Sequence, residues 1–311
     1  LRKRYFSNVS PLKGICTLAW SKSSPFRKRR GRFEGTPLDY EGAVTAMLGR
    51  TMSEATLTTE SGTDPILEIE GLRLSPETGA FDLVARDGEV VAIVGLLGSG
   101  KSRLAECIYG LSAPHSGTIR LDGEPYSPST PREAVAKGVF MSPKDRGNNA
   151  VIPAFDIANN MTLPFLGSFS AAFFLSGGRQ KGRAREMVND VGIVCQSESD
   201  GIGTLSGGNQ QKVMIARWLL EPSRVLLLDE PFQGVDIGAR RDIGRHIRAS
   251  ARGRATLVFV AEVDEALEIA DRIVVMADGT VVGEHRNEGI NMAALVADIS
   301  LAAREETTEK A

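Results

Sequence analysis

The chain has 311 residues, with 37 lysines and arginines against 39 aspartates and glutamates. Its hydrophobic share of 42% and charged share of 24% are those of globular proteins, which excludes a fibrous or wholly disordered chain. The charge is uneven, because residues 1–39 hold ten basic and two acidic side chains, so the remainder sums to about −10. Three cysteines and three histidines, all far apart, argue against a disulfide framework or a zinc site.

Composition divides the chain into four parts. Residues 1–39 are basic and rich in serine and proline, which predicts a disordered leader. Residues 40–64 contain a short amphipathic helix followed by a polar linker. Residues 65–300 alternate short apolar runs with helical segments, which predicts an α/β domain, and residues 301–311 form a polar tail.

Short apolar runs predict nine strands, listed here in chain order: Leu67–Leu74, Phe81–Ala85, Val90–Val94, Thr118–Leu121, Val139–Met141, Val225–Leu228, Leu257–Val260, Ile273–Met276 and Val281–Glu284. Helical periodicity predicts helices after Gly100 and over Arg183–Val191, Gln210–Leu220, Gly238–Ala251 and Val263–Ala270. The strands at 90–94 and 225–228 are uninterrupted apolar runs, as expected where helices cover both faces of a sheet.

The strongest motif is the Gly-x-x-x-x-Gly-Lys-Ser run Gly95–Ser102, which lies between a predicted buried strand and a predicted helix. Its glycines let the backbone turn N–H groups toward phosphate oxygens, and the helix start adds its positive dipole end. Lys101 is expected to reach the β- and γ-phosphates, and Ser102 to bind Mg²⁺. A glycine turn with an incidental lysine is the alternative. The candidate nucleotide-binding residues are Gly95, Leu96, Leu97, Gly98, Ser99, Gly100, Lys101, Ser102 and Arg103.

A second motif follows the apolar strand at residues 225–228, which leads into Asp229, Glu230 and Pro231. Beside a phosphate loop, Asp229 is expected to bind Mg²⁺ or an ordered water, as Ser102 does. Glu230 is expected to orient or activate the attacking water, which makes it the candidate catalytic residue. Alone, the run also fits a strand followed by a turn.

A third motif opens the helix predicted from Gln210. A Ser-Gly-Gly helix start presents a hydroxyl and free backbone N–H groups to an anion. An ordinary N-cap serine in a flexible loop is the alternative. The residues of this motif are Leu205, Ser206, Gly207, Gly208, Asn209 and Gln210.

Taken in this order, the three motifs resemble those of an ATP-binding cassette (ABC) ATPase. With Gly234–Asp236 and Ala261–Glu262, residues 205–212 are similar to the second cassette of the tandem ATPases of bacterial ribose-, xylose- and galactoside-type importers. Ala46–Arg50 resembles the tail of the first cassette in such proteins. The resemblance implies a P-loop NTPase fold of the ABC type, with a mixed sheet core, an antiparallel β subdomain and a helical signature subdomain.

The resemblance also implies activity and partners. Two cassettes of this family pack head to tail around two ATP molecules, so Ser206, Gly207 and Gly208 would contact the ATP of a second cassette. Asp236 would lie at the contact between cassettes. Such an ATPase uses ATP and Mg²⁺, joins integral-membrane permease subunits at the cytoplasmic face of the cell membrane, and serves a periplasmic sugar-binding protein indirectly. No nucleic-acid partner is expected.

Several positions depart from the usual pattern of the family. Ala261 stands where most cassettes have a switch histidine, and Ser142–Pro143 where they have a glutamine. Pro143–Arg146 is similar to the Pro-Glu-Asp-Arg run of the sugar-importer subfamily. Leu74–Pro76 offers no aromatic ring to stack on adenine, and Phe81 is expected to pack in the core. Two alternatives therefore remain: a cassette that binds nucleotide without hydrolysis and only supports dimer closure, or a truncated or split gene product.

A phenylalanine-rich stretch has two interpretations. It contains Phe155, Phe165, Phe169, Phe173 and Phe174. Buried, these rings form a core cluster, whereas an exposed patch would indicate a partner surface such as the one that meets a permease.

Overall fold

The computed structural model describes residues 9–10, 15–17, 32–34, 62, 64–144, 150–171 and 174–299. The chain forms two compact units, one of residues 1–56 with 291–297 and one of residues 57–290 with 298–311. In the first unit, three short strands pair antiparallel: β1 (Val9–Ser10), β2 (Ile15–Thr17) and β3 (Arg32–Glu34). They lie in the leader for which composition predicts disorder. The rest of that leader, most of the predicted linker and the tail at 301–311 lie outside the described residues.

A six-stranded sheet forms the centre of the second unit, in the order β15-β14-β6-β13-β12-β9. Its strands are β6 (Val90–Val94), β9 (Val139–Ser142), β12 (Val225–Asp229), β13 (Ala255–Val260), β14 (Arg272–Ala277) and β15 (Thr280–Arg286). The first five pair parallel, and β15 runs antiparallel to β14 at one edge. The predicted mixed sheet is therefore confirmed.

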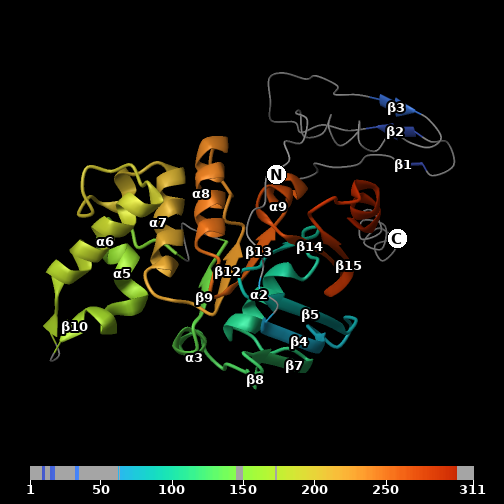
Figure 1. Ribbon diagram of the computed structural model, residues 1–311, viewed down its shortest axis with the longest axis horizontal. Coiled ribbons are helices and arrows are strands. Elements are labelled where there is room, and N and C mark those ends of the chain that lie inside the picture. The colour runs from blue at the N-terminus through green and yellow to red at the C-terminus, as the bar shows by residue number, and fades with distance from the viewer. Residues whose placement is uncertain are drawn as a thin grey trace. The chain divides into compact units, whose positions relative to one another are not determined.

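A second, antiparallel sheet has the order β5-β4-β7-β8. Its strands are β4 (Pro65–Arg73), β5 (Phe81–Arg86), β7 (Ser116–Leu121) and β8 (Glu124–Pro125). Side chains alternate along a strand, so one face of the central sheet, with Val91, Ile93 and Phe259, shares a core with this sheet and with α2 (Lys101–Tyr109). Figure 1 shows α2 among the strands that it covers. Phe81 lies in this shared core, as predicted.

Three helices accompany the other face of the central sheet: α7 (Gly207–Leu219), α8 (Ile237–Ala249) and α9 (Val263–Ile269). Helix α9 contacts β6 and β13, α7 contacts β9, and α8 packs between α7 and α9. Covered in this way on both sides, β6, β12 and β13 are buried at every position. This explains why these strands are continuous apolar runs in the sequence.

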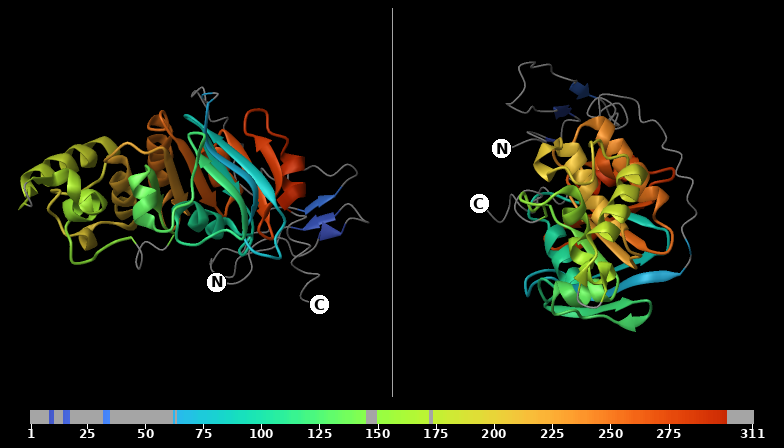
Figure 2. Two further views of the ribbon diagram at one scale, coloured as in Figure 1. Left: turned by 90° about the horizontal axis from the view of Figure 1, so that it is seen from below. Right: turned by 90° about the vertical axis from the view of Figure 1, so that its left-hand side faces the viewer.

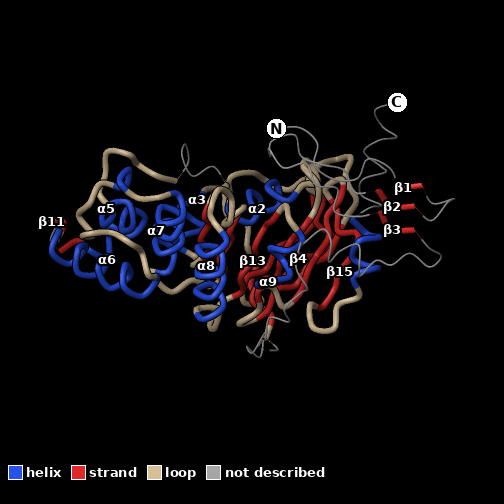
Figure 3. Tube along the Cα trace, turned by 90° about the horizontal axis from the view of Figure 1, so that it is seen from above, coloured by secondary structure: helices blue, strands red, loops and turns tan. Residues whose placement is uncertain are grey.

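A helical region extends from the β9 side of the sheet, as Figures 2 and 3 show. It consists of α5 (Ile157–Thr162), the 3-10 helix η1 (Leu163–Phe169), the hairpin β10 (Ser170–Ala171) and β11 (Phe174–Leu175), α6 (Gly177–Val191), the 3-10 helix η2 (Ile202–Thr204) and α7. Both predicted subdomains, antiparallel and helical, are thus present. Within residues 64–144, 150–171 and 174–299, no helix has the length and hydropathy needed to cross a membrane.

The phenylalanine-rich stretch divides between core and surface. Phe165 and Phe169 are buried, and the ring of Phe165 lies with Phe140 and Trp218 at centroid distances of 5.2 and 5.9 Å. Phe174, in contrast, is 81% exposed. Phe155 is 37% exposed, and Phe173 lies outside the described residues. Neither interpretation therefore holds for the whole stretch.

All nine predicted strands are confirmed, with ends that differ from the prediction by at most two residues. The five predicted helices are confirmed as α2, α6, α7, α8 and α9, although α6 begins six residues earlier than predicted, at Gly177. Helix α3 (Pro131–Ala136) was not predicted. The hydroxyl of Thr130 accepts a hydrogen bond from the Glu133 backbone, which is the start signal of a helix.

Ion pairs between α8 and α9 surround Glu265, a largely buried carboxyl group close to the carboxyl edge of the sheet. The Arg240 guanidinium lies 3.2 Å from Asp264, 3.8 Å from Glu265 and 3.0 Å from Glu268. Burial nevertheless raises the pKa of Glu265 to about 8, with further contributions from the neighbouring carboxylates Glu262 and Glu230, and Arg240 only partly offsets these effects. Between pH 4.5 and about 8, Glu265 is therefore mostly protonated in the folded protein and mostly ionised in the unfolded chain.

Replacement of this carboxyl group by an amide is expected to change how stability depends on pH. The contribution of Glu265 to stability is fully present below its ordinary pKa of 4.5 and is lost as the pH rises toward about 8. Glu265→Gln does not titrate, so relative to the unchanged protein it should gain on the order of 3 kcal/mol of unfolding free energy between pH 4.5 and 8. Urea unfolding at pH 5, 7 and 9 measures this difference. The exposed Glu288→Gln is the control, and a difference that does not depend on pH would contradict the prediction.

Candidate functional site

The chemistry-bearing residues gather at the carboxyl edge of the central sheet. Parallel strands end at the same edge, so the segments that follow β6, β9, β12 and β13 lie next to one another. Gly95 follows β6, Asp229 ends β12, and Ala261 follows β13. Pro143 follows β9, the strand that pairs with β12 on its other side. Residues far apart in the sequence thus meet at one place.

The phosphate loop is built on glycines that the fold requires. A Cβ on Gly95 would lie 2.4 Å from the backbone oxygen of Met276 and 2.5 Å from the Ser99 hydroxyl. Gly100, the residue before α2, has a φ of 95°, a conformation that other residues avoid. The loop therefore turns tightly from β6 into α2, with its backbone N–H groups at the helix start. Leu97, at its tip, is 87% exposed.

Inside the loop, Lys101 and Ser102 have different partners. The Lys101 ammonium donates to the carbonyl oxygens of Gly95 and Leu96, and the Ser102 hydroxyl donates to Asp229 Oδ2 at 3.1 Å. Burial lowers the pKa of Lys101 and raises that of Asp229, although the hydrogen bond from Ser102 opposes the second shift. The buried Lys101 ammonium, the buried Asp229 carboxylate and the Ser102 hydroxyl together form a polar site. Such a site suits an anion and a cation bound together.

Glu230 directly follows β12 in an unusual backbone conformation. Its φ is 50°, in the left-handed region, which few residues other than glycine adopt. The Glu230 backbone N–H donates to the Phe259 oxygen at 2.8 Å, and its oxygen accepts from Gln233 at 3.1 Å. These bonds hold a backbone geometry that costs free energy, as is common at functional sites.

The residue that sequence analysis missed is Lys144. Its ammonium lies 3.6 Å from Glu230 Oε1, and it also acts electrostatically on Lys101 and Asp229. Sequence analysis considered the loop after β9 for its missing glutamine and for the likeness of Pro143–Arg146 to a Pro-Glu-Asp-Arg run, but gave Lys144 no role. The position of Lys144 could have indicated its role, because the residues that follow a strand at this edge of the sheet lie at the site.

A hollow of about 350 Å³ lies beside the phosphate loop. Its walls come from the turn between β4 and β5, from the loop and α2, and from the turn before β15: Leu74, Ser75, Thr78, Gly98, Gly100, Arg103, Asp278 and Gly279. Arg103 also donates to the Ala113 oxygen at 3.1 Å. None of these lining residues is aromatic.

The donor set fits magnesium. Mg²⁺ prefers oxygen ligands and is usually held by one or two carboxylates together with substrate phosphates. Ser102 and Asp229 supply a hydroxyl and a carboxylate, and the buried Ser99 hydroxyl has no hydrogen-bond partner in the described part of the chain. Among those same residues, no group of three or more histidine, cysteine, aspartate or glutamate side chains forms a metal site complete in itself. The fit is thus to a metal that arrives with a phosphate ligand.

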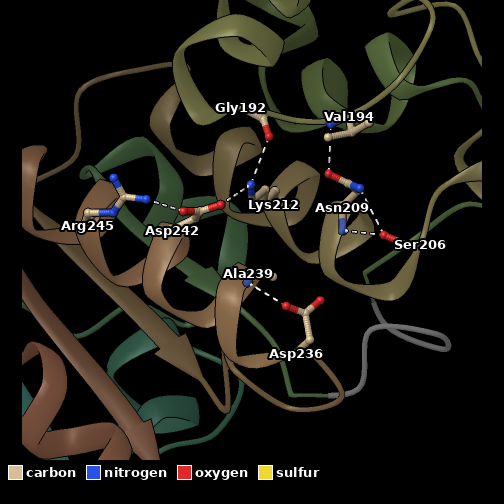
Figure 4. Close-up of polar contacts among 9 residues, drawn as sticks. All are labelled: Gly192, Val194, Ser206, Asn209, Lys212, Asp236, Ala239, Asp242 and Arg245. Carbon is tan, nitrogen blue, oxygen red and sulfur yellow. Dashed lines mark hydrogen bonds and ion pairs between the residues drawn. The ribbon is translucent and has the colours of Figure 1, made fainter.

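The third motif opens α7, with Ser206 as its N-cap. Figure 4 shows Asn209 between two partners: its amide nitrogen donates to the Ser206 hydroxyl at 3.0 Å, and its amide oxygen accepts from the Val194 N–H at 2.9 Å. The Gln210 amide donates to the oxygens of Ile202 and Leu205 at 3.3 and 3.2 Å. The serine is therefore held by its own helix and by the preceding segments, while Ser206 itself stays exposed.

Helix α8 packs closely against the start of α7. Asp236 caps α8 by accepting from the Ala239 N–H at 3.0 Å. A Cβ on Gly208 would lie 2.9 Å from the Ala239 Cβ and 3.8 Å from Asp236 Oδ2. Further along, the buried Lys212 donates to the Gly192 oxygen at 2.9 Å and to Asp242 at 3.0 Å (Figure 4). The start of α7 thus has a fixed position relative to α8.

The fold brings some of the candidate residues together and keeps others apart. Lys101, Ser102, Asp229 and Glu230 converge at the sheet edge, whereas Ser206 begins a helix of the helical region. Figures 1 and 3 agree that α7 and α2 lie apart, with α8 and the β9 side of the sheet between them. The serine motif and the phosphate loop of one chain therefore do not form a single site.

Comparisons with known proteins agree with this geometry. Residues 80–233, about half of the chain, match the ABC transporter family. The chain is 39% identical over 254 residues to a ribose import ATP-binding protein, RbsA 2, of Rubrobacter xylanophilus, covering 81% of this chain and 49% of that protein. It is 33% identical over 252 residues to an arabinose import ATP-binding protein, AraG, of Azospirillum brasilense, covering 80% and 48%.

The fold agrees with a solved cassette. MJ1267, an ATP-binding cassette of an ABC transporter, superimposes with a TM-score of 0.66 at 22% identity, covering 78% of this chain and 99% of that one. The chain spans about half the length of the curated relatives that it matches. Motif order, fold and these comparisons lead to one conclusion: the chain belongs to the ABC transporter family, as an ATP-binding cassette related to the ribose and arabinose import ATP-binding proteins.

Proposed function

We propose that this chain is the ATP-binding and ATP-hydrolysing subunit of an ABC importer for a monosaccharide of the ribose or arabinose class. The observation that carries the proposal is the hydrogen bond of 3.1 Å between Ser102 and Asp229, next to a lysine-bearing phosphate loop and followed by Glu230. A strand-end carboxylate beside a phosphate-loop hydroxyl is the arrangement that MgATP requires. The sugar class comes from the relatives, whose names include ribose and arabinose import.

In this proposal, the residues at the sheet edge share the work. The loop N–H groups and Lys101 bind the β- and γ-phosphates, and the hollow beside Leu74 and Arg103 receives the nucleoside. Ser102 and Asp229 hold Mg²⁺, which when bound neutralises charge on the phosphates. Glu230 is the general base: its carboxylate accepts a proton from the water that attacks the terminal phosphorus, and ADP is the leaving group.

The exposed serine motif is proposed to act on a second cassette. Ser206 is exposed and begins a helix that lies apart from the phosphate loop of its own chain. Together with Gly207 and Gly208, it is proposed to meet the terminal phosphate of ATP on a partner cassette. Asp236, at the start of the adjacent α8, is then at the contact between the two cassettes. ATP thereby joins two cassettes, and hydrolysis releases them.

Membrane partners are part of the same proposal. Integral-membrane permease subunits are proposed to bind the helical region, whose β11 exposes Phe174 and Leu175. This arrangement puts the chain at the cytoplasmic face of the cell membrane, with a periplasmic sugar-binding protein as an indirect partner. No nucleic-acid partner is proposed.

One observation favours a second candidate function. Ala261 follows β13 at the site edge and brings no titratable side chain to the position of the usual switch histidine. A cassette that binds MgATP only to close the dimer, without hydrolysis, fits this residue. The two candidates differ in whether phosphate is released at this site.

Glu230→Gln is expected to separate nucleotide binding from hydrolysis. The amide cannot accept the water proton, so phosphate release should fall by about 10²–10⁴-fold, while MgATP binding remains within about threefold. The assay uses proteoliposomes with the permease and a partner cassette whose own catalytic glutamate has been removed. Sugar uptake in the same vesicles tests the transport role.

Exposed Glu124→Gln is the control and should leave phosphate release unchanged. Unchanged release by Glu230→Gln would overturn the catalytic assignment. Binding without release by the unaltered chain would favour the second candidate. Hydrolysis that drives no monosaccharide uptake would overturn the transport role.

A second variant tests whether the serine motif depends on the packing of α7 against α8. In Gly208→Ala, the new Cβ meets the Ala239 Cβ, so one helix must shift, at a cost of about 1–3 kcal/mol of unfolding free energy. The control is Gly182→Ala in α6, where the new Cβ has nothing within 4 Å apart from its chain neighbours and the backbone of its own helix. It should gain up to about 1 kcal/mol. Urea unfolding compares the two, and equal stability of both variants would contradict this account of Gly208.

A further inference from the structure

The loop after β9 brings a cation to a site that the family motifs do not assign to it. Lys144 Nζ lies 3.6 Å from Glu230 Oε1, and the two side chains differ in exposure, at 40% for the lysine and 10% for the glutamate. Backbone hydrogen bonds hold the main chain of Glu230, and its side chain is mostly buried, whereas Lys144 has a long flexible stem in contact with water. Of the two partners, the lysine is the one that can move.

The ion pair places Lys144 beside the strand end that carries the two carboxylates. Glu230 directly follows Asp229, whose Oδ2 accepts from the Ser102 hydroxyl at 3.1 Å. Lys144 itself follows β9, which pairs in parallel with β12. The lysine therefore reaches the same edge of the sheet from the neighbouring strand.

The place of Lys144 matters under the proposed binding mode. The hollow beside Leu74 and Arg103 lies at one side of the phosphate loop, and the Ser102 hydroxyl contacts Asp229 at the strand end. A nucleotide with its base in the hollow and its phosphates on the loop would direct its last phosphate toward this strand end. Lys144, beside Glu230, would then meet the third phosphate and not the second.

We infer that Lys144 recognises the terminal phosphate of the bound nucleoside triphosphate and leaves Glu230 to do so. The step is an exchange of ionic partners and involves no covalent change. A partly exposed ion pair at 3.6 Å is weak, and a terminal phosphate carries more charge than a carboxylate, so the phosphate competes well for the ammonium. The exchange releases the Glu230 carboxylate when a hydrolysable phosphate is present. The inference rests on the proposed ATP-binding function and adds to it a residue that distinguishes triphosphate from diphosphate.

The experiment compares two nucleotides on the full chain with Mg²⁺ present: the non-hydrolysable β,γ-imido analogue of ATP, and ADP. Lys144→Met should lower the affinity for the triphosphate analogue by about tenfold, which corresponds to the loss of one charge-assisted hydrogen bond. The affinity for ADP should change by less than about twofold. Lys144→Arg keeps the charge and should restore most of the affinity for the analogue. Lys137→Met, at the exposed end of α3, is the matched control and should change neither value.

A second arm tests the exchange itself. In Glu230→Gln, no ion pair has to be broken, so the analogue should bind about threefold more tightly, and only while Lys144 is present. In the double variant Lys144→Met with Glu230→Gln, that gain should disappear. Dissociation constants by titration calorimetry report both arms, and circular dichroism checks that each variant is folded.

The outcomes distinguish this inference from the proposed function. Equal weakening of the analogue and ADP by Lys144→Met would overturn it, since a general electrostatic or structural effect does not depend on the third phosphate. No weakening of either nucleotide would overturn it too. If the unaltered chain binds neither nucleotide, the proposed function fails as well. If Lys101→Met abolishes the binding of both nucleotides while Lys144→Met changes neither affinity, the proposed function stands and this inference alone falls.

Discussion

The parallel pairing of β6, β13, β12 and β9 is the constraint on which the rest of the site depends. Because these strands run the same way, each one ends at the same edge of the sheet. Ser102 and Asp229 are separated by 127 positions, and the pairing brings their side chains within 3.1 Å. The glycine loop, the two carboxylates and Lys144 all emerge at this edge, so the strand order determines which groups can act together.

This edge carries costs that the surrounding core offsets. Asp229 and Lys101 are buried against their preference for water, Glu230 has a left-handed backbone, and the buried Ser99 hydroxyl finds no partner among the described residues. Unfavourable groups of this kind persist where packing elsewhere holds them. Here the fully buried strands β6, β12 and β13 provide that packing. Gly95 and Gly208 are part of the same packing, since each allows a close approach of another segment that a side chain would prevent.

The two functional ends of the cassette are organised differently. The phosphate loop is stabilised by the sheet, whereas Ser206 is held within the helical region by Asn209 and by the packing of α7 on α8. Lys212 connects α7 to the end of α6 and to Asp242 of α8. The serine motif is therefore held in place by both the helical region and α8. This separation is what makes a second cassette necessary for the proposed mechanism.

Most of the regular structure of the cassette could be predicted from local patterns. The run at 90–94 is apolar throughout because helices cover both faces, and the helix after Gly100 follows from the loop chemistry. Short elements such as α3 escaped, although Thr130 and Glu133 formed a start signal, because six residues give too little periodicity. The fate of Phe165 and Phe174 was not predictable, since a ring buried in the core and one exposed at the surface look alike in a sequence.

The sequence by itself determined the chemistry of the site: which loop can turn around a phosphate, which strand end carries the two carboxylates, and which helix begins with serine and two glycines. These properties depend on residues that are close together along the chain, so they can be predicted from the spacing of those residues. Only the tertiary structure decided that Lys144 faces Glu230, that Gly208 lies against Ala239, and that α7 stands apart from α2. Such contacts join segments that are distant in sequence. The order of strands and the packing of helices bring these segments together, and no local sequence pattern predicts that order or packing.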